Sequence, residues 1–557
     1  MLAQAIGMGR TIERLYLSHL ECKMPLNQKL DESFAKKVDL GNTPKTVIAF
    51  PYSGDYRVDV LIDGPLDKWS PELAAGQVRT VTYSFALTQG YLSGVGYEEE
   101  RDELTPFTQA EIAATRKIFA YMGSILPINF VEVVESTLAN SPVGEIRMAN
   151  NKQSSAGYAF SPSASDTKIR GDIFLSNSYI KESFAAGTYE YDTLIHEIAH
   201  AIGLKHPGNY NAGSAPSTEP GNYLANSEDS KMLSVVSYAE HEDFLQRIDF
   251  APYDLLALKY LYGLKAQNVG DNTYVWTDSI GGQLQTLVDD AGRDTIDLKN
   301  ITQDTVLDLR EGYSSDVGTW SFEDLSNFPS QKNLQIAYGT VIEVVRGSNK
   351  ADVITGNASN NLFEGRGGND VLNGGEGLDT AVWSGLFSQY KLSRTQNGFT
   401  VEATTGSEGK DQIQNIERLS FSDQGLALDI SANAGIAAKV IGAVFGKAAL
   451  TNKQYVGIGL YYLDELSFNY GNLLQLAINA RLGANPSHEQ VVDLLYTNVI
   501  EQAPDAATRK TYTSLLDNQS YSVASLGVLA ADTEYNKANV NLVGLAQTGL
   551  GYLPFTT

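Results

Sequence analysis

Alternating apolar and polar residues predict a small mixed β-sheet in the first half of the chain. Successive side chains of a strand point to opposite faces, so such alternation is typical of short strands. The expected strands cover residues 80–85, 128–134, 145–148, 156–160 and 172–175. Residues 108–122 instead carry apolar side chains at helical spacing, and Thr108 is placed to cap that helix.

The later part of the chain changes its pattern twice. Residues 307–313, 336–343 and 416–423 alternate as β-strands do. After residue 430 the composition shifts toward alanine, leucine and tyrosine with helical periodicity. Helices are expected near 434–447, 452–466, 470–482, 487–500, 506–516 and 533–546.

Between residues 347 and 381 the sequence repeats every nine positions. The recurring residues are the glycines 347, 356, 365 and 374, then Asp352, Asn361, Asp370 and Asp379, then Ile354, Phe363, Leu372 and Ala381. A nonapeptide of this kind builds a calcium-bound parallel β-roll. Its six-residue turn offers backbone carbonyls and a carboxylate, and its three-residue strand points one apolar side chain inward.

Two nonapeptides make one coil of such a roll, so turns 18 residues apart stack and share a metal ion. This pairs residues 347–352 with 365–370, and 356–361 with 374–379, and predicts two principal Ca²⁺ sites. The candidate ligands are Gly347, Asn349, Asp352, Gly356, Ala358, Asn361, Gly365, Gly367, Asp370, Gly374, Glu376 and Asp379. A glycine-rich surface loop is the alternative, and four units in register argue against it.

Three of the six histidines lie close together, at His196, His200 and His206. The first two are four residues apart, which places them on one face of an α-helix. Two neutral imidazoles at that separation reach one Zn²⁺. Gly203 allows the left-handed conformation that ends a helix, so that His206 supplies a third nitrogen.

Glu197 lies beside the histidine pair, where it would polarise a metal-bound water instead of binding the metal. Three protein ligands leave one coordination position open, which is typical of catalytic zinc. The alternative is a core helix with hydrogen-bonded histidines. The additional match of Gly203 and His206 favours the metal site.

Composition narrows the possible partners. The chain has 557 residues, enough for about three or four domains. Its net charge of −25 argues against nucleic acid and anionic membranes, and no apolar run is long enough to form a membrane span. An acidic chain with 50 glycines suits calcium binding by carboxylates and carbonyls. The single cysteine, Cys22, excludes an internal disulfide, and residues 1–10 lack the pattern of a secretory signal peptide.

The extended histidine pattern is that of the metzincin proteases. Within that group, Pro207 and residues 208–213 make the chain resemble the serralysin family. The resemblance covers roughly residues 50–430. It implies a zinc protease with Zn²⁺ and Ca²⁺ as cofactors, acting on protein or peptide substrates.

The resemblance also implies roles for residues around the zinc. Residues 234–238 are similar to the family's turn beneath the metal, where Tyr238 would ligate the resting zinc or stabilise the oxyanion. Val236 takes the place of the family's methionine and keeps an apolar floor. An edge strand would pair with extended substrate, and its residues are Ala156, Gly157, Tyr158, Ala159 and Phe160.

Further features follow from the same resemblance. Asp289, Ala291 and Asp294 are similar to another calcium loop of the family, and residues 487–531 resemble a helical repeat of unassigned function. For that helical part, packing without a ligand is the preferred interpretation. Cytosolic calcium is low, so the roll would fold after export. We therefore expect a secreted, extracellular monomer, exported by type I secretion machinery that reads a C-terminal signal.

The expected fold class is multidomain α+β. Residues 1–45 are expected as a pro-segment, 46–262 as a metzincin catalytic domain with a mixed sheet and a zinc helix, 263–430 as a parallel β-roll and β-sandwich that binds calcium, and 431–557 as an all-α domain.

These features together predict a secreted, calcium-dependent zinc endopeptidase made as a latent zymogen. The Cys22 thiolate would block the zinc until the pro-segment is cut, although an incidental free cysteine is the alternative. A function of another class is a calcium-dependent surface or adhesion protein, whose protease site is vestigial or acts only in self-maturation.

Overall fold

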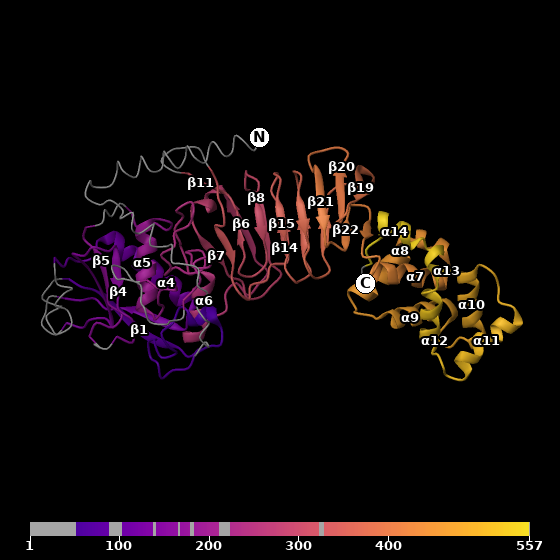
Figure 1. Cartoon of the computed structure of the whole chain (residues 1–557), viewed down its shortest axis with the longest axis horizontal. Helices are drawn as coiled ribbons and strands as arrows, with labels where there is room; N and C mark the ends of the chain where they lie inside the picture. The colour runs from indigo at the N-terminus through magenta and orange to yellow at the C-terminus, as the bar shows by residue number, and fades with distance from the viewer. Residues whose placement is uncertain are drawn as a thin grey trace.

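The computed structural model shows an elongated molecule (Figure 1). The described residues are 52–87, 103–136, 141–164, 168–178, 183–210, 223–321 and 328–555. Buried apolar side chains form three large clusters, drawn mainly from residues 58–262, 280–428 and 427–550. The corresponding parts follow one another along the molecule, and they are called the α/β region, the β region and the helical region.

The α/β region contains the mixed sheet that the alternation predicted. Its strands are β1 (Arg79–Phe85), β2 (Ile128–Glu132), β3 (Ile146–Asn151), β4 (Gly157–Ala159) and β5 (Ile173–Ser176). Their order is β2-β1-β3-β5-β4, and only β4 runs antiparallel to its neighbour. The helices are α3 (Tyr56–Asp59), α4 (Gln109–Ile125), α5 (Tyr189–Ala201) and α6 (Pro252–Tyr262). Thr108 caps α4 in a capping box, as its position predicted.

Helix α5 carries the first two histidines, and the local sequence accounts for both of its ends. Thr188 begins it, because its hydroxyl accepts a hydrogen bond from the Tyr191 N–H. The helix ends at Ala201, and Gly203 follows with a φ of +107°, which other residues rarely adopt. A Cβ atom at Gly203 would also lie 2.1 Å from the Asp67 carbonyl oxygen. The turn toward His206 therefore requires glycine.

The β region consists largely of short strands. They are β6 (Thr273–Thr277), β7 (Gln285–Leu287), β8 (Thr295–Asn300), β9 (Val306–Asp308), β10 (Ser314–Ser315), β11 (Thr319–Trp320), β12 (Phe328–Pro329), β13 (Leu334–Ile336), β14 (Val344–Arg346), β15 (Val353–Thr355), β16 (Leu362–Glu364), β17 (Val371–Asn373), β18 (Thr380–Val382), β19 (Tyr390–Arg394), β20 (Phe399–Ala403), β21 (Lys410–Gln414), β22 (Arg418–Ser420) and β23 (Gly425–Ala427). The two largest sheets have the orders β24-β23-β22-β18-β16-β14-β8-β6 and β19-β20-β21-β17-β15-β9. Short 3₁₀ helices cover Asp278–Gly282 and Phe387–Gln389.

The nonapeptide repeat forms the coils that its period predicted. β14 pairs in parallel with β16, and β15 with β17, which places Val345 beside Phe363 and Ile354 beside Leu372. The apolar residue of each three-residue strand is buried in the cluster of the β region. Stacking 18 residues apart is therefore confirmed for all four units.

Two strand predictions in this region were wrong in extent. Of residues 336–343 only Ile336 lies in a strand, because the chain turns at Gly339, which has a φ of +91°. The strand expected over 307–313 ends at Asp308, and Gly312 turns the chain with a φ of +78°. Alternation alone does not distinguish a strand from an extended segment that enters a tight turn.

The helical region contains α7 (Asn433–Phe445), α8 (Lys453–Asp464), α9 (Tyr470–Leu482), α10 (His488–Ile500), α11 (Ala506–Asp517), α12 (Val523–Ala531), α13 (Glu534–Asn539) and α14 (Leu542–Thr548), with a 3₁₀ helix at Lys447–Thr451. α12 was not predicted. The single helix expected over 533–546 is two helices, because Asn541 between them has a φ of +52°. Strand β24 (Leu550–Tyr552) then joins the sheet of the β region beside β23, so the expectation of an all-α segment over residues 431–557 was wrong at its end. Among the described helices, none is long and apolar enough to cross a membrane.

Candidate metal centre

The side chains of His196, His200 and His206 converge, as their spacing predicted. The Nε2 atoms of His196 and His200 are 3.1 Å apart. The Nε2 atom of His206 lies 3.3 Å from that of His196 and 3.0 Å from that of His200. Within the described part of the chain, this is the one group of three or more His, Cys, Asp or Glu side chains close enough to hold a metal ion.

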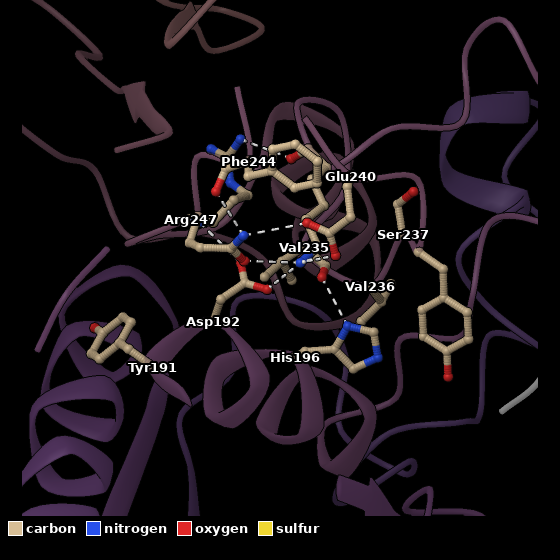
Figure 2. A network of polar contacts seen from close by, with 12 residues as sticks. Tyr191, Asp192, His196, Val235, Val236, Ser237, Glu240, Phe244 and Arg247 are labelled. Carbon is tan, nitrogen blue, oxygen red and sulfur yellow. Dashed lines mark hydrogen bonds and ion pairs between the residues drawn. The ribbon is translucent and has the colours of Figure 1, made fainter. Parts of the chain in front are cut away.

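Hydrogen bonds on the outer side of the His196 and His200 rings determine which nitrogen of each ring presents a lone pair to the centre. Nδ1 of His196 donates to the Val235 carbonyl at 3.0 Å (Figure 2). Nδ1 of His200 donates to the Leu204 carbonyl at 2.7 Å. A neutral imidazole carries one N–H, so both Nε2 atoms present lone pairs. Two lone pairs at this separation repel each other unless a cation lies between them.

A zinc ion fits this arrangement. Tetrahedral zinc with Zn–N bonds of about 2.0–2.1 Å keeps its nitrogens about 3.3 Å apart, close to the observed separations. Burial, reinforced by the neighbouring histidines, lowers the pKa of His196 well below its usual value, and burial lowers that of His200. Both rings are therefore neutral, which is the form that binds a metal. The three histidines supply the donor set of a zinc site.

Glu197 follows His196 on α5 and is only 5% exposed. Its Oε2 atom has no hydrogen-bond partner. Burial raises the pKa of this carboxyl to about 8. Buried carboxyl oxygens without partners are rare, and a catalytic role or a bound ion is one explanation for them. A cation held by the histidines would lower this pKa and favour the carboxylate form.

The last two nonapeptide turns contain acidic side chains whose hydrogen bonding is incomplete. Asp370 and Asp379 are buried, and the Oδ2 atom of each lacks a hydrogen-bond partner. Burial raises the pKa of Asp370 to about 8 and that of Asp379 to about 7. Unpaired oxygens in buried turns fit Ca²⁺, which takes six to eight oxygen ligands.

The first two turns are closed by hydrogen bonds within the protein. Asp352 accepts from the N–H groups of Ser348 at 2.6 Å and Thr305 at 3.2 Å. The Asn361 side-chain oxygen accepts from the Asn357 N–H at 2.9 Å. The acidic and amide side chains of these two turns are therefore already occupied. The other predicted ligands lie in the same four turns: Gly347, Asn349, Gly356, Ala358, Gly365, Gly367, Gly374 and Glu376.

Comparison with known proteins gives a matching family model for the repeat and several similar proteins. A family model described as the RTX calcium-binding nonapeptide repeat matches residues 346–381 in four copies. Serralysin of Proteus mirabilis is 29% identical over 326 residues, which are 53% of this chain and 63% of that protein. Serralysin C of Dickeya chrysanthemi is 33% identical over 189 residues, 30% of this chain and 37% of its own. Metalloprotease AprA of Pseudomonas entomophila is 28% identical over 366 residues, 60% of this chain and 70% of its own.

The chain is serralysin-like. It spans less than two thirds of the length of the Proteus mirabilis relative. Its cofactors are zinc, which fits the histidine triad, and calcium, which the nonapeptide repeat binds.

In the serralysin-like chain the turn beneath the histidines is held by a buried aspartate. Asp254, at the start of α6, accepts from the Val235 N–H at 2.8 Å and from the Ser234 hydroxyl at 2.7 Å. This fixes the Val235 carbonyl that orients His196. Val236 is fully buried in the apolar cluster, which agrees with the expected apolar floor. The sequence analysis missed Asp254, since nothing near it in the chain signals a contact with this turn.

Tyr238 lies against the histidines, and a second tyrosine holds it. Its ring centroid is 4.4 Å from that of His206 and 5.6 Å from that of His196. Tyr210 stacks on Tyr238 at 4.7 Å, and its hydroxyl accepts from the Tyr238 N–H at 2.9 Å. The same hydroxyl donates to Asp229 at 3.1 Å. Tyr210 was missed as a site residue, although its position four residues after His206 was a possible signal.

The predicted substrate strand, residues 156–160, forms the edge of the sheet next to Glu197. The Ala156 carbonyl accepts from the Ser176 N–H, and the Phe160 N–H donates to the Asp172 carbonyl, both toward β5 or its flanks. In an antiparallel pair the intervening groups point the other way, so the backbones of Gly157 and Ala159 face the open edge. The Tyr158 ring stacks on Phe174. A Cβ atom at Gly157 would lie 2.9 Å from Glu197 Cγ, so this strand and the carboxyl are in close contact.

The remaining predicted site residues lie elsewhere. Asp289 and Asp294 are buried in one loop after β7, with Ala291 exposed between them. Asp289 accepts from the Tyr274 hydroxyl at 2.6 Å, and Asp294 from the Asn272 N–H at 2.7 Å. Cys22 and the predicted pro-segment, residues 1–45, lie outside the described residues.

Proposed function

We propose that this chain is a calcium-dependent zinc endopeptidase of the serralysin type. One observation carries the proposal: the inward lone pairs of His196 and His200, completed by His206, stand beside the unpartnered carboxyl of Glu197. A metal site without a base would suit a structural role. A neighbouring buried acid with no other partner supplies the base that hydrolysis needs.

In this mechanism the three histidines hold the zinc, and the protein's own groups move the proton. Bound zinc supplies Lewis acidity, which makes water a better nucleophile near neutral pH and polarises a carbonyl. Glu197 takes the proton from the attacking water and passes it to the leaving amine. The Val235 carbonyl and the Leu204 carbonyl keep His196 and His200 in the tautomer that faces the centre. Tyr238 packs on the histidine rings, and its hydroxyl donates a hydrogen bond to the developing oxyanion.

An extended peptide would bind by adding a strand to β4. The backbones of Gly157 and Ala159 face the open edge, with the Gly157 carbonyl also accepting from the Ser155 hydroxyl at 3.1 Å. Close contact between Gly157 and Glu197 would place the scissile bond near the base. Backbone pairing holds many sequences alike, so this favours an endopeptidase with protein or peptide substrates.

The proposal also covers the organisation and location of the protein. We assign residues 46–262 to a metzincin catalytic domain, 263–430 to a calcium-binding roll and sandwich, and 431–557 to a helical domain. The separate apolar clusters of the three regions support this division. We also propose secretion as an extracellular monomer through a type I exporter. The repeat supports an extracellular location, because its buried carboxyls would bind calcium at extracellular concentrations.

Exchange of the base tests the enzyme directly. Glu197→Gln keeps the size of the side chain and all three histidines, so zinc content should stay the same. Cleavage of casein should fall by about 10²- to 10⁴-fold in kcat/KM. Glu190→Gln on the same helix is the matched control and should keep wild-type activity. Equal casein cleavage by wild type and Glu197→Gln would contradict the mechanism.

The same assay separates the alternative function. A surface or adhesion protein with a self-maturing protease would cut its own chain, but not casein or gelatin. Mass spectrometry of the incubated protein would then show cleavage that disappears in Glu197→Gln. A vestigial site would show neither activity.

Latency through Cys22 is a separate part of the proposal. A thiolate on the zinc would exclude the catalytic water until residues 1–45 are removed. Cys22→Ser should therefore speed activation of the full-length protein. Maturation of the variant at the wild-type rate would contradict the role of the cysteine and leave the peptidase proposal intact.

A further inference from the structure

The turn that orients His196 is tied to a buried network of charged side chains (Figure 2). Lys231 lies three residues before this turn, and its N–H donates to the Ala239 carbonyl just after it. The Lys231 Nζ lies 2.7 Å from Asp192 Oδ2 and 3.0 Å from Gln246 Oε1. Asp192 lies one helical turn before His196 on α5. The Lys231 and Asp192 side chains are only 5% and 3% exposed. The turn and the zinc helix are therefore joined through a desolvated ion pair.

Arg247 connects this network to the β region. Its side chain is fully buried. On one side, Nη1 donates to the carbonyls of Lys231 and Met232, each at 3.1 Å. On the other side, Nη1 donates to Gln335 Oε1 at 3.2 Å and Nη2 to Thr286 Oγ1 at 2.5 Å. One guanidinium thus divides its donors between the segment that leads into the turn beneath the zinc site and strands β7 and β13.

A neighbouring aspartate strengthens this connection. Asp249 accepts from Arg247 Nη2 at 2.9 Å and from the Thr286 N–H at 3.0 Å. The Arg247 N–H itself donates to Asp192 Oδ1 at 3.0 Å. Backbone and side chain of this arginine therefore contact the zinc helix, the turn and the β region together.

The strand that Arg247 contacts leads to the coils of the calcium-binding repeat. β7 ends at Leu287, the Asp294 carbonyl in the next loop accepts from the Val344 N–H of β14 at 2.9 Å, and β14 pairs in parallel with β16 of the repeat. The Asp289 N–H donates to the Thr340 hydroxyl at 2.9 Å, which links the loop to the segment after β13. β7 and β13 pair in parallel over three residues. Order in this part of the β region therefore determines where Thr286 and Gln335 lie.

We infer that Arg247 is a positioning residue, through which calcium-dependent order of β7 and β13 tightens metal binding at His196, His200 and His206. The inference rests on the proposed zinc function of that triad. When β7 and β13 are in place, Arg247 holds the turn, and the Val235 carbonyl keeps the His196 ring aimed at the metal. When they are not, the turn loses two of its anchors and the ring reorients at a cost in affinity.

Such coupling between two ion sites is reciprocal, because calcium and the triad metal bias the same arrangement of the turn. Calcium should raise the affinity of the triad for metal by about 5- to 150-fold, the usual range of allosteric coupling. Arginine is suited to this position, since a planar fork contacts two carbonyls and two side chains at once, whereas lysine provides a point charge.

Cobalt binding to the full-length protein tests the inference without peptide hydrolysis. Co²⁺ replaces zinc at histidine sites, and its visible absorption reports the ligand geometry. The Co²⁺ affinity and spectrum would be measured in metal-stripped buffer with and without saturating Ca²⁺. Wild type should bind Co²⁺ more tightly, and with a sharper spectrum, when calcium is present.

Two variants locate the connection. Thr286→Val keeps the shape of the side chain but removes the oxygen that accepts from Arg247, and should lower the calcium effect on Co²⁺ affinity several-fold. Arg247→Lys should lower it further. Thr302→Val is the matched control, because its exposed hydroxyl bonds to Asp278 in the same region, and should keep the wild-type factor. If Arg247→Lys does not fold, Thr286→Val decides the question.

Each result supports or contradicts the inference. A calcium effect unchanged in Thr286→Val, with circular dichroism like that of the wild type, would overturn it. The inference would also be overturned if the Co²⁺ affinity and spectrum of the wild type did not change when calcium is added. Failure of the proposed function has a different signature, namely no Co²⁺ or Zn²⁺ bound at the triad, or a triad that binds metal without any peptidase activity.

Discussion

At Gly203 the chain leaves helix α5 and turns toward His206 with a φ of +107°. Gly203→Ala would place a side chain in this unfavourable conformation and set its Cβ 2.1 Å from the Asp67 carbonyl oxygen. We expect a loss of about 2–4 kcal/mol in stability from strain and displaced backbone. The turn carries the third zinc ligand, so zinc affinity should fall as well. Thermal unfolding and competition with a zinc chelator measure the two effects.

Gly270→Ala is the matched control for this residue. Gly270 has no positive φ, and a Cβ atom added there would meet no other atom within 4 Å. Stability and zinc affinity of this variant should stay within about 0.5 kcal/mol of wild type. Equal effects of the two substitutions would show that the turn tolerates a side chain and that His206 does not depend on it.

Among the elements, the last two nonapeptide turns should make calcium binding depend on pH. Without calcium, burial raises the pKa of Asp370 to about 8 and that of Asp379 to about 7, against about 3.9 in an unfolded chain. The folded roll then holds these protons more tightly, so its calcium-free stability is greatest at low pH and falls as pH rises through 7 to 8. Calcium needs the carboxylates and must displace the protons. Calcium should therefore stabilise the folded roll less at pH 6 than at pH 8, measured as the shift of the urea midpoint on adding calcium, followed by circular dichroism.

A pair of substitutions distinguishes the last two turns, in which Asp370 and Asp379 each have one carboxylate oxygen without a partner, from the first two turns. Asp379→Asn should stabilise the calcium-free roll at pH 8 and weaken calcium binding, because it removes a buried charge that only the cation balances. Asp352→Asn should change the pH dependence less, since Asp352 already accepts two backbone hydrogen bonds. An equal calcium-induced shift of the urea midpoint at pH 6 and pH 8 in wild type would rule out this explanation.

For the whole molecule, Arg418 provides a buried polar link between the β region and the helical region. It lies in β22, is 5% exposed, and pairs with Asp429 and with Asp464 of α8, the latter at 2.8 Å. Arg418→Met would leave two buried carboxylates without their cation. We expect a loss of about 3–5 kcal/mol and unfolding of the helices at lower urea than the β region. Far-ultraviolet circular dichroism during urea titration follows the helices.

Arg394 provides the comparison across the same boundary. It is exposed and donates to the Ala546 carbonyl of α14 at 3.2 Å. Arg394→Met should change stability by less than about 1 kcal/mol, because solvent compensates an exposed donor. If both arginine variants unfold at the wild-type midpoint, the link between the two regions does not depend on the buried ion pairs.

Sequence reasoning succeeded where a few neighbouring residues determine the outcome. Thr108 and Glu111 form the predicted capping box, and His196 and His200 share a helix face. The nine-residue period placed Ile354 beside Leu372 in the roll. Sequence reasoning failed at residues 336–343 and at Asn541, where a single turn residue breaks an otherwise regular pattern.

The sequence by itself therefore determined the shared helix face of His196 and His200 and the repeat, because both depend on backbone periodicity over a few positions. Only the tertiary structure decided how they are held. The Val235 carbonyl that orients His196 lies 39 residues away, and Arg247 reaches Gln335 across 88 residues. The tertiary structure also distinguished Asp370, whose Oδ2 has no partner, from Asp352, both of whose carboxylate oxygens accept hydrogen bonds, although the two occupy the same place in the repeat. Such differences arise from packing between distant segments, which no local period encodes.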